Sequence, residues 1–128
     1  MLPNRTPENN MRFSEQLVSL DHAVVLERLG GDEELLHEVA QIFLEEYPSL
    51  MAEMREAAQA GDAHRLERAA HSLKGSIANF GAESAVQAAL TVEKIGRSGE
   101  MGGAVDAFEE LAALMNQLHP CFEQLAAV

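Results

Sequence analysis

The chain has 128 residues, of which 47% are hydrophobic and only 5% aromatic, with no Trp, so we expect one helical domain with an aliphatic core. The formal net charge of −12 argues against binding to nucleic acid and to anionic membrane surfaces. A single cysteine, Cys121, excludes an intrachain disulfide, and no run suits a membrane span or a signal peptide, so the sequence predicts a cytoplasmic protein.

Residues 1–17 are mostly polar and contain Pro3 and Pro7, which is typical of a flexible tail or an interdomain linker. No internal repeat or low-complexity tract divides the rest of the chain. We therefore expect a single folded domain over residues 18–128.

A short helix is predicted over residues 20–29, with Asp21 as its N-cap and Gly30 and Gly31 at its end. A helix of this length cannot bury its apolar side by itself. We expect it to pack across a larger bundle.

A much longer helix is predicted from the N-cap Asp32 to Gly61. Its apolar stripe comprises Leu35, Val39, Ile42, Phe43, Leu50, Met54 and Ala57. Pro48 interrupts the run, and we expect it to kink the helix rather than divide it. Phe43 or Tyr47 could lie on a docking surface, although both residue types are more often part of a core.

Residues 62–81 form the next predicted helix, with Asp62 as N-cap and Gly81 just beyond its end. At about 100° per residue, its apolar side comprises Leu66, Ala69, Leu73, Ile77 and Phe80. The opposite side comprises His64, Glu67, Arg68, His71, Lys74, Gly75 and Ala78. His71 therefore lies at the middle of the exposed face.

Gly75 is unusual on this face, because glycine inside a helix costs about 1 kcal/mol relative to alanine. Its missing side chain opens the approach to His71, and Lys74 places a cation beside the opening. A neutral imidazole is a competent nucleophile near pH 7, so these residues suit a histidine that carries a phosphoryl group. An ordinary solvated face would also contain such residues, and a glycine in mid-helix also occurs where two helices cross closely.

Two further helices are predicted over residues 82–97 and from Gly102 to Ala126. The first ends at Gly96 and Gly99. The apolar stripe of the second comprises Val105, Phe108, Leu111, Ala112, Met115, Leu118, Phe122 and Leu125, and Pro120 should bend it. Four long helices with short joints predict an all-α fold, an antiparallel up-down-up-down four-helix bundle with an additional short N-terminal helix.

The string AHSLKGSIANFGA, residues 70–82, closely resembles the signature of histidine phosphotransfer (HPt) domains of multistep two-component phosphorelays. The matching residues are His71, Leu73, Lys74, Gly75, Ser76, Gly81 and Ala82. The resemblance is specific around His71 and compositional over the rest of residues 18–126. It implies a four-helix bundle with an extra N-terminal helix, in agreement with the helices predicted above.

The resemblance implies a phosphocarrier rather than an enzyme. His71 would accept a phosphoryl group at Nε2 from a receiver-domain phosphoaspartate and pass it to another receiver domain. The implied partners are response regulator receiver domains and a hybrid sensor histidine kinase, and we expect the carrier to be a monomer. No cofactor of its own is expected, because Mg²⁺ belongs to the receiver. No phosphate-cradling GxxxxGK loop or ATP-binding motif is present.

Roles for the neighbouring residues follow from the resemblance and from helix geometry. Lys74 would screen the phosphoryl charge, and Gly75 would admit the receiver. The docking surface would further include Glu67, Arg68, His64, Ala78 and Asn79. Glu67 and Arg68 either contact the partner or form a surface pair. Asn79 touches either the phosphoryl group or the helix end.

Two other functions are compatible with the sequence. One is a non-catalytic module that binds a receiver and sequesters or inhibits a signalling protein, although binding alone needs no nucleophile. The other is a phosphatase that uses His71 as a general base, but no visible motif supplies a carboxylate to orient the imidazole. The remaining histidines form no HxxxH or HExxH pair, so no metal site is expected.

Overall fold

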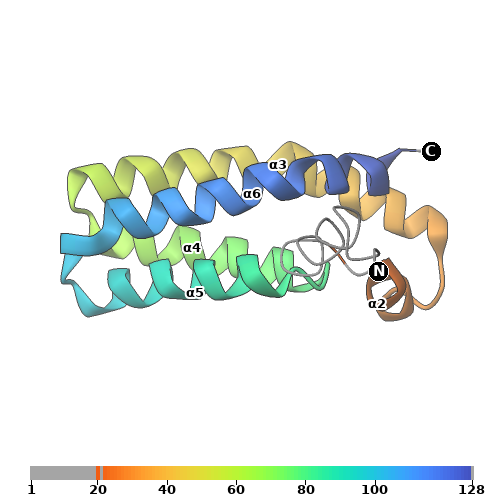
Figure 1. Ribbon diagram of the computed structural model, residues 1–128, viewed down its shortest axis with the longest axis horizontal. Coiled ribbons are helices and arrows are strands. Elements are labelled where there is room, and N and C mark those ends of the chain that lie inside the picture. The colour runs from red at the N-terminus through yellow and green to blue at the C-terminus, as the bar shows by residue number, and fades with distance from the viewer. Residues whose placement is uncertain (1–19, 21, 128) are drawn as a thin grey trace, which may run out of the picture.

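The computed structural model describes residue 20 and residues 22–127. Its four long helices are α3 (Glu33–Ala60), α4 (Ala63–Ala78), α5 (Glu83–Ser98) and α6 (Ala104–Ala126). The short helix α2 (His22–Arg28) lies across one end of the bundle, and a 3₁₀ turn, η2 (Met101–Gly103), precedes α6 (Figure 1). The predicted tail at residues 1–17 and the predicted cap Asp21 lie outside the described residues.

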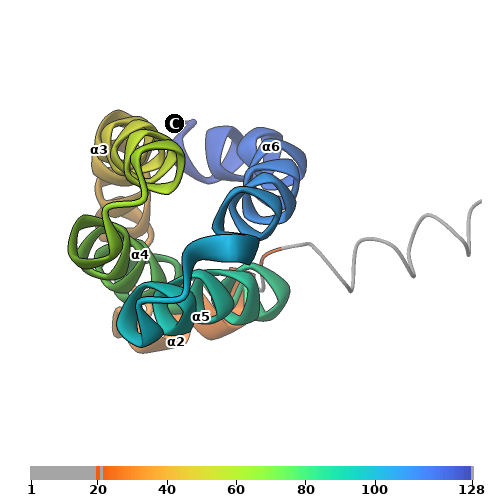
Figure 2. The same ribbon diagram turned by 90° about the vertical axis from the view of Figure 1, so that its left-hand side faces the viewer.

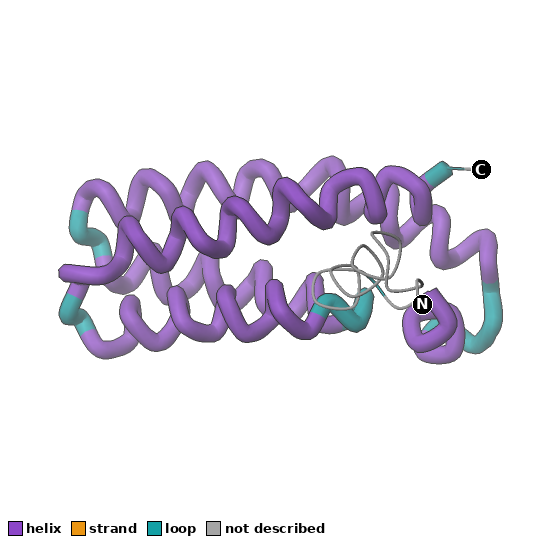
Figure 3. The backbone as a smooth tube through the Cα atoms, viewed as in Figure 1, coloured by secondary structure: helices purple, strands orange, loops and turns teal. Residues whose placement is uncertain are grey.

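The four long helices occupy the corners of a square in chain order, so each packs against the helix before it and the helix after it (Figure 2). In side view, α3 and α6 form one layer and α4 and α5 form the other (Figure 1). Short loops join consecutive helices at alternate ends (Figure 3). The predicted up-down-up-down four-helix bundle with a short N-terminal helix is confirmed.

The helix ends follow from local chemistry. The carboxylates of Asp32 and Asp62 cap α3 and α4, each accepting a hydrogen bond from the backbone N–H three residues on, at 3.0 and 3.2 Å respectively. Gly61 ends α3 in the left-handed conformation with φ 72°. The α4 helix ends at Ala78, earlier than predicted, because Asn79 is its C-cap.

Both prolines inside predicted helices leave those helices undivided. Pro48 lies within α3, which continues to Ala60, and Pro120 lies within α6, which continues to Ala126. Each proline removes one backbone donor, but both helices have buried residues before and after the proline, so both halves pack into the core.

The core lies between the four long helices and contains the whole predicted apolar side of α4. Three stripe residues predicted elsewhere are wrong, because Leu35, Ile42 and Val105 are 38%, 52% and 43% exposed. On α3 the buried series instead begins Leu36, Ala40, Phe43, Tyr47. A change of one position turns a side chain by about 100°, which moves Leu35 and Ile42 to the edge of the stripe.

The prediction that Gly96 marks a helix end is wrong. Gly96 lies inside α5, where that helix crosses α4. A Cβ atom on Gly96 would lie 2.7 Å from the backbone N of Glu67 and 2.8 Å from the carbonyl O of Ala63. Only glycine permits this close approach of the two backbones.

Charge is divided unevenly between the two layers. The α3 helix carries seven acidic residues and one basic residue, and α6 carries four acidic residues and no basic one. By contrast, α4 carries three basic residues and one acidic, and α5 carries two of each. The net charge is therefore −10 on the α3–α6 layer and +2 on the α4–α5 layer.

Candidate functional site

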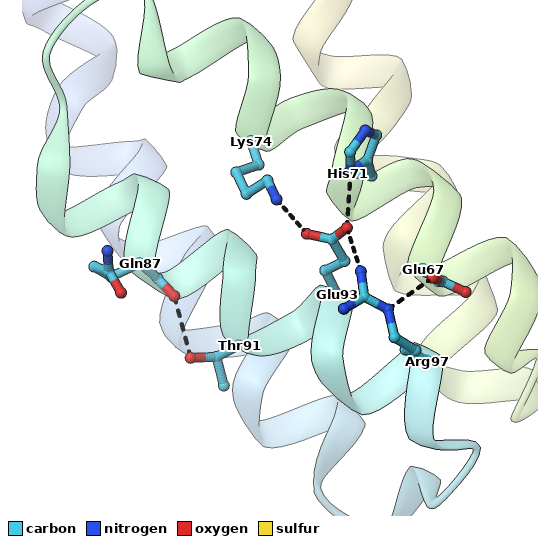
Figure 4. A network of polar contacts seen from close by, with 7 residues as sticks. All are labelled: Glu67, His71, Lys74, Gln87, Thr91, Glu93 and Arg97. Carbon is cyan, nitrogen blue, oxygen red and sulfur yellow. Dashed lines mark hydrogen bonds and ion pairs between the residues drawn. The ribbon is translucent and has the colours of Figure 1, made fainter.

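The imidazole of His71 stands on the outer face of α4 and is 68% exposed. Its Nδ1 atom lies 2.8 Å from Oε2 of Glu93, on the neighbouring helix α5 (Figure 4). Its other ring nitrogen, Nε2, points away from this contact (Figure 4). One edge of the ring is therefore held, and the other is open to a partner.

Glu93 is the one charged side chain that is buried in the described part of the chain, with 2% exposure. Its Oε2 also accepts a hydrogen bond of 2.9 Å from Arg97, while Oε1 lies 2.7 Å from Nζ of Lys74. Oε1 has no hydrogen-bond partner of regular geometry, so we treat the Lys74 contact as an ion pair. Arg97 in turn donates from Nε to Glu67 at 3.1 Å.

These contacts determine the protonation of the carboxylate. Burial by itself would raise the pKa of the Glu93 carboxyl, but the contacts with Lys74 and His71 outweigh it and hold that pKa below its ordinary value. The group is thus ionised near neutral pH and can only accept hydrogen bonds.

The ionised carboxylate in turn fixes the tautomer of His71. Because Glu93 can only accept, the Nδ1 atom of His71 must carry the proton of their hydrogen bond. In the neutral ring, Nε2 then has a free lone pair. The geometry therefore presents a nucleophilic nitrogen to solvent.

The close crossing at Gly96 brings these residues together. Glu93 lies three positions before Gly96 on α5, and His71 lies four positions after Glu67 on α4, so both lie one turn from the crossing. A wider separation of the helices would take the carboxylate out of reach of the imidazole.

Gly75 is exposed, and a Cβ atom placed on it would meet no atom within 4 Å. This excludes one explanation left open by the sequence, a close helix crossing at Gly75, because the crossing is at Gly96 instead. The open space beside Gly75 fits the predicted access for a partner.

Lys74 lies beside His71 as predicted, but its side chain is only 26% exposed and its ammonium faces Glu93. The predicted role of Lys74, screening the phosphoryl charge, stays a prediction. In this structure its cation stabilises Glu93, the carboxylate that holds the imidazole.

A shallow hollow lies beside the imidazole, between α4 and α5. It is lined by His64, Glu67, Arg68, His71, Ser72 and Glu93. Glu67 forms a surface pair, one of the two alternatives for it, but the partner is Arg97 and not Arg68. Arg68 is exposed and forms no ion pair within the described residues, so its cation faces the hollow and solvent.

Ala78 and Asn79 lie apart from this hollow, about two turns beyond His71. The carbonyl O of Ala78 accepts a hydrogen bond of 2.6 Å from Arg28 of α2, and Asn79 caps the end of α4. Of the two alternatives for Asn79, the structure favours the helix end. Phe43 and Tyr47 are buried and so belong to the core.

The sequence interpretation missed Glu93 and Arg97, and its statement that no carboxylate orients His71 is wrong. One feature of the sequence did point to Glu93. Glu93 falls on the buried stripe of α5, one turn after Ala89 and one turn before Gly96. A charged residue in an otherwise small and apolar stripe needs a partner, and the exposed face of α4 carries the candidates.

The described part of the chain contains no group of three or more His, Cys, Asp or Glu side chains that could hold a metal ion. None of its helices is both long enough and apolar enough to cross a membrane.

Comparisons with known proteins agree with this site. The family model described as "Hpt domain" matches residues 38–120. The structure of histidine-containing phosphotransfer protein B (HptB) from Pseudomonas aeruginosa PAO1 is similar, with a TM-score of 0.75 and 27% sequence identity. The match covers 82% of this chain and 91% of that chain. A search of curated proteins found no significant match.

Proposed function

The chain belongs to the Hpt domain family, which serves histidine phosphotransfer in phosphorelays, and on that premise we propose that it is a phosphocarrier whose acceptor atom is Nε2 of His71. The observation that carries the proposal is the state of one ring: His71 is 68% exposed, and buried Glu93 holds its Nδ1. A side chain that only solvates a helix needs no such partner.

In the proposed reaction the lone pair of Nε2 attacks the phosphorus of a receiver-domain phosphoaspartate in line. The N–P bond forms as the bond between phosphorus and the aspartate oxygen breaks, and the carboxylate leaves as an anion. The proton on Nδ1 stays in place, so the phosphorylated ring carries a positive charge. Transfer to the next receiver reverses these steps.

Glu93 supports both directions of this reaction. Its carboxylate compensates the charge that develops on the ring when Nε2 bonds to phosphorus, as a buried carboxylate does for the histidine of a catalytic triad. Since the hydrogen bond is already formed at 2.8 Å before reaction, no reorganisation is needed at the moment of transfer.

The partner supplies what the carrier lacks. The carboxylate nearest to His71 is already engaged by Lys74 and Arg97, so it does not suit a Mg²⁺ ion, which we assign to the receiver domain. Gly75 and the hollow beside His71 leave room for the receiver's active site. A hybrid sensor kinase that carries a receiver domain would be the upstream donor.

Incubation with a phosphorylated receiver domain tests the proposal. We expect a label on the protein that is lost in acid, stable in alkali and absent from His71→Gln. His22→Gln is the matched control, because His22 is an exposed histidine on α2 that does not line the hollow beside His71, and it should label as the wild type does. A folded wild type that binds the receiver but takes no label would contradict the proposal.

A phosphatase is the second candidate, favoured by the His71–Glu93 pair, because a carboxylate-held imidazole can also act as a general base toward water. The phosphatase hypothesis predicts loss of phosphate from the receiver with no phosphohistidine at any time.

A third candidate is a module that only binds receivers. This hypothesis predicts unchanged signalling in His71→Ala. Label on His71 that passes to a second receiver excludes both.

A further inference from the structure

Arg97 connects the two helices that form the site. It lies one turn after Glu93 on α5, and its guanidinium donates from Nη2 to Oε2 of Glu93 at 2.9 Å and from Nε to Glu67 of α4 at 3.1 Å (Figure 4). The Glu93 oxygen that it contacts is the same one that accepts from His71. Arg97 is 58% exposed, so burial of its own side chain does not explain this placement.

The two cations hold the carboxylate in different ways. Lys74 approaches Oε1 as an ion pair without regular hydrogen-bond geometry, and an ammonium on a flexible stem can follow a carboxylate as it turns. The guanidinium of Arg97 is planar, and Glu67 tethers it from the other helix. Arg97 is therefore the contact that fixes which oxygen of Glu93 lies under His71.

We propose that Arg97 is a positioning residue for phosphotransfer, which holds Oε2 of Glu93 against Nδ1 of His71 and so keeps Nε2 free of a proton and directed outward. This inference rests on the proposed function and adds a residue to it. Without Arg97, Lys74 alone would hold the carboxylate, and Glu93 could turn away from the ring. His71 would then lose its acceptor at Nδ1 and would also populate the tautomer that is protonated at Nε2, in which Nε2 has no lone pair to attack phosphorus.

The test compares Arg97→Gln with the wild type in two measurements. The ¹⁵N spectrum of the His71 ring reports the tautomer directly, and we expect a new population protonated at Nε2 in the variant. Single-turnover transfer from a phosphorylated receiver should slow by about tenfold, the lower end of the loss found when the outer partner of a metal-ligating histidine is removed. The receiver concentration that gives half the maximal rate should stay unchanged.

Two further variants separate positioning from charge and from folding. Lys94→Gln removes one positive charge from the neighbouring exposed position of α5, where no ion pair is present among the described residues, and it should keep the wild-type tautomer and rate. Arg97→Lys should recover part of both, because an ammonium at this spacing reaches Glu93 but has no planar fork to engage both Glu93 and Glu67. If Arg97→Gln does not fold, Arg97→Lys still must show an intermediate tautomer population.

A wild-type tautomer in Arg97→Gln would overturn the proposal. The proposal would also be overturned if Arg97→Gln lost rate only because it binds the receiver more weakly, and if Lys94→Gln showed the same loss. The ring spectrum does not depend on phosphotransfer. Failure of the proposed function would appear separately. The wild type would then take no label, while Arg97→Gln would still show the new tautomer population in its ring spectrum.

Discussion

At the scale of single residues, the site combines a buried carboxylate with an exposed base. Glu93 is 2% exposed and has contacts with His71, Lys74 and Arg97. A buried charge is tolerated only when it is paired and hydrogen-bonded. Three partners around one carboxylate therefore make the position sensitive to any substitution that removes its charge.

Glu93→Gln keeps the shape of the side chain and removes its charge. We expect phosphotransfer to slow by about 10- to 100-fold, because an amide cannot compensate the charge on the phosphorylated ring. The free energy of unfolding should fall by about 1.5–3 kcal/mol, since hydrogen bonds to a charged group are lost. Single-turnover kinetics and urea unfolding measure the two effects. An unchanged transfer rate would contradict the role given to Glu93.

The same carboxylate gives the stability a dependence on pH. The pKa of Glu93 in the folded protein lies below its ordinary value of 4.5, so its contribution is present above about pH 4.5 and is lost as the pH falls through the lower folded-state pKa. The difference in free energy of unfolding between the wild type and Glu93→Gln should therefore be largest near neutral pH and shrink in acid. Urea unfolding between neutral pH and about pH 3 tests this, with exposed Glu109→Gln as control. A difference that is constant with pH would be inconsistent with this account.

Gly75 offers a substitution in which stability and transfer should move in opposite directions. Gly75→Gln should raise the free energy of unfolding by up to about 1 kcal/mol, since a better helix former replaces glycine in open space. It should impair transfer, because its side chain occupies the approach to His71. Gly75→Ala is the control, with a similar gain in stability and little steric effect. Normal transfer in Gly75→Gln would remove the argument from access.

At the scale of helices, Gly96 sets the distance between α4 and α5. In Gly96→Ala the added Cβ would lie 2.7 Å from the backbone of Glu67, and backbone atoms cannot turn aside. We expect the free energy of unfolding to fall by about 1–3 kcal/mol as the helices separate, and the Nδ1 hydrogen bond of His71 to weaken. Chemical denaturation and the ¹⁵N spectrum of the ring measure both. Stability equal to that of the wild type would show that the crossing is not as close as described.

Helix starts, caps and the apolar side of α4 could be predicted because their signals are local, as with Asp32 and Asp62. The phase of the stripe on α3 was harder to predict, because α3 packs against both α4 and α6 and an error of one residue exposes Leu35 and Ile42. The contact between His71 and Glu93 joins residues 22 positions apart. It depends on the rotation of two helices about their axes, which periodicity gives only roughly.

At the scale of the whole molecule, the architecture separates stability from function. The core lies between the four helices, while the exposed ring of His71 and the hollow beside it lie on the outer face of one layer. The predicted bundle and the predicted acceptor histidine could therefore be reached independently. The first came from helical periodicity and the second from a specific string on one exposed face.

The uneven charge of the helices in the two layers, −10 against +2, makes the bundle electrically asymmetric, and His71 lies on its less negative side. A partner that presents a negatively charged phosphoaspartate would meet a molecule already turned toward it, since such fields raise association rates by about 10- to 1,000-fold. The association rate constant measured by stopped flow should fall steeply from about 0.02 to about 0.5 M salt, while the rate of the bound transfer step stays constant. An association rate that is insensitive to salt would argue against this steering. If the rate falls with salt as expected, the many acidic residues of α3 and α6, which touch neither His71 nor its network, contribute to signalling through the speed and orientation of each encounter.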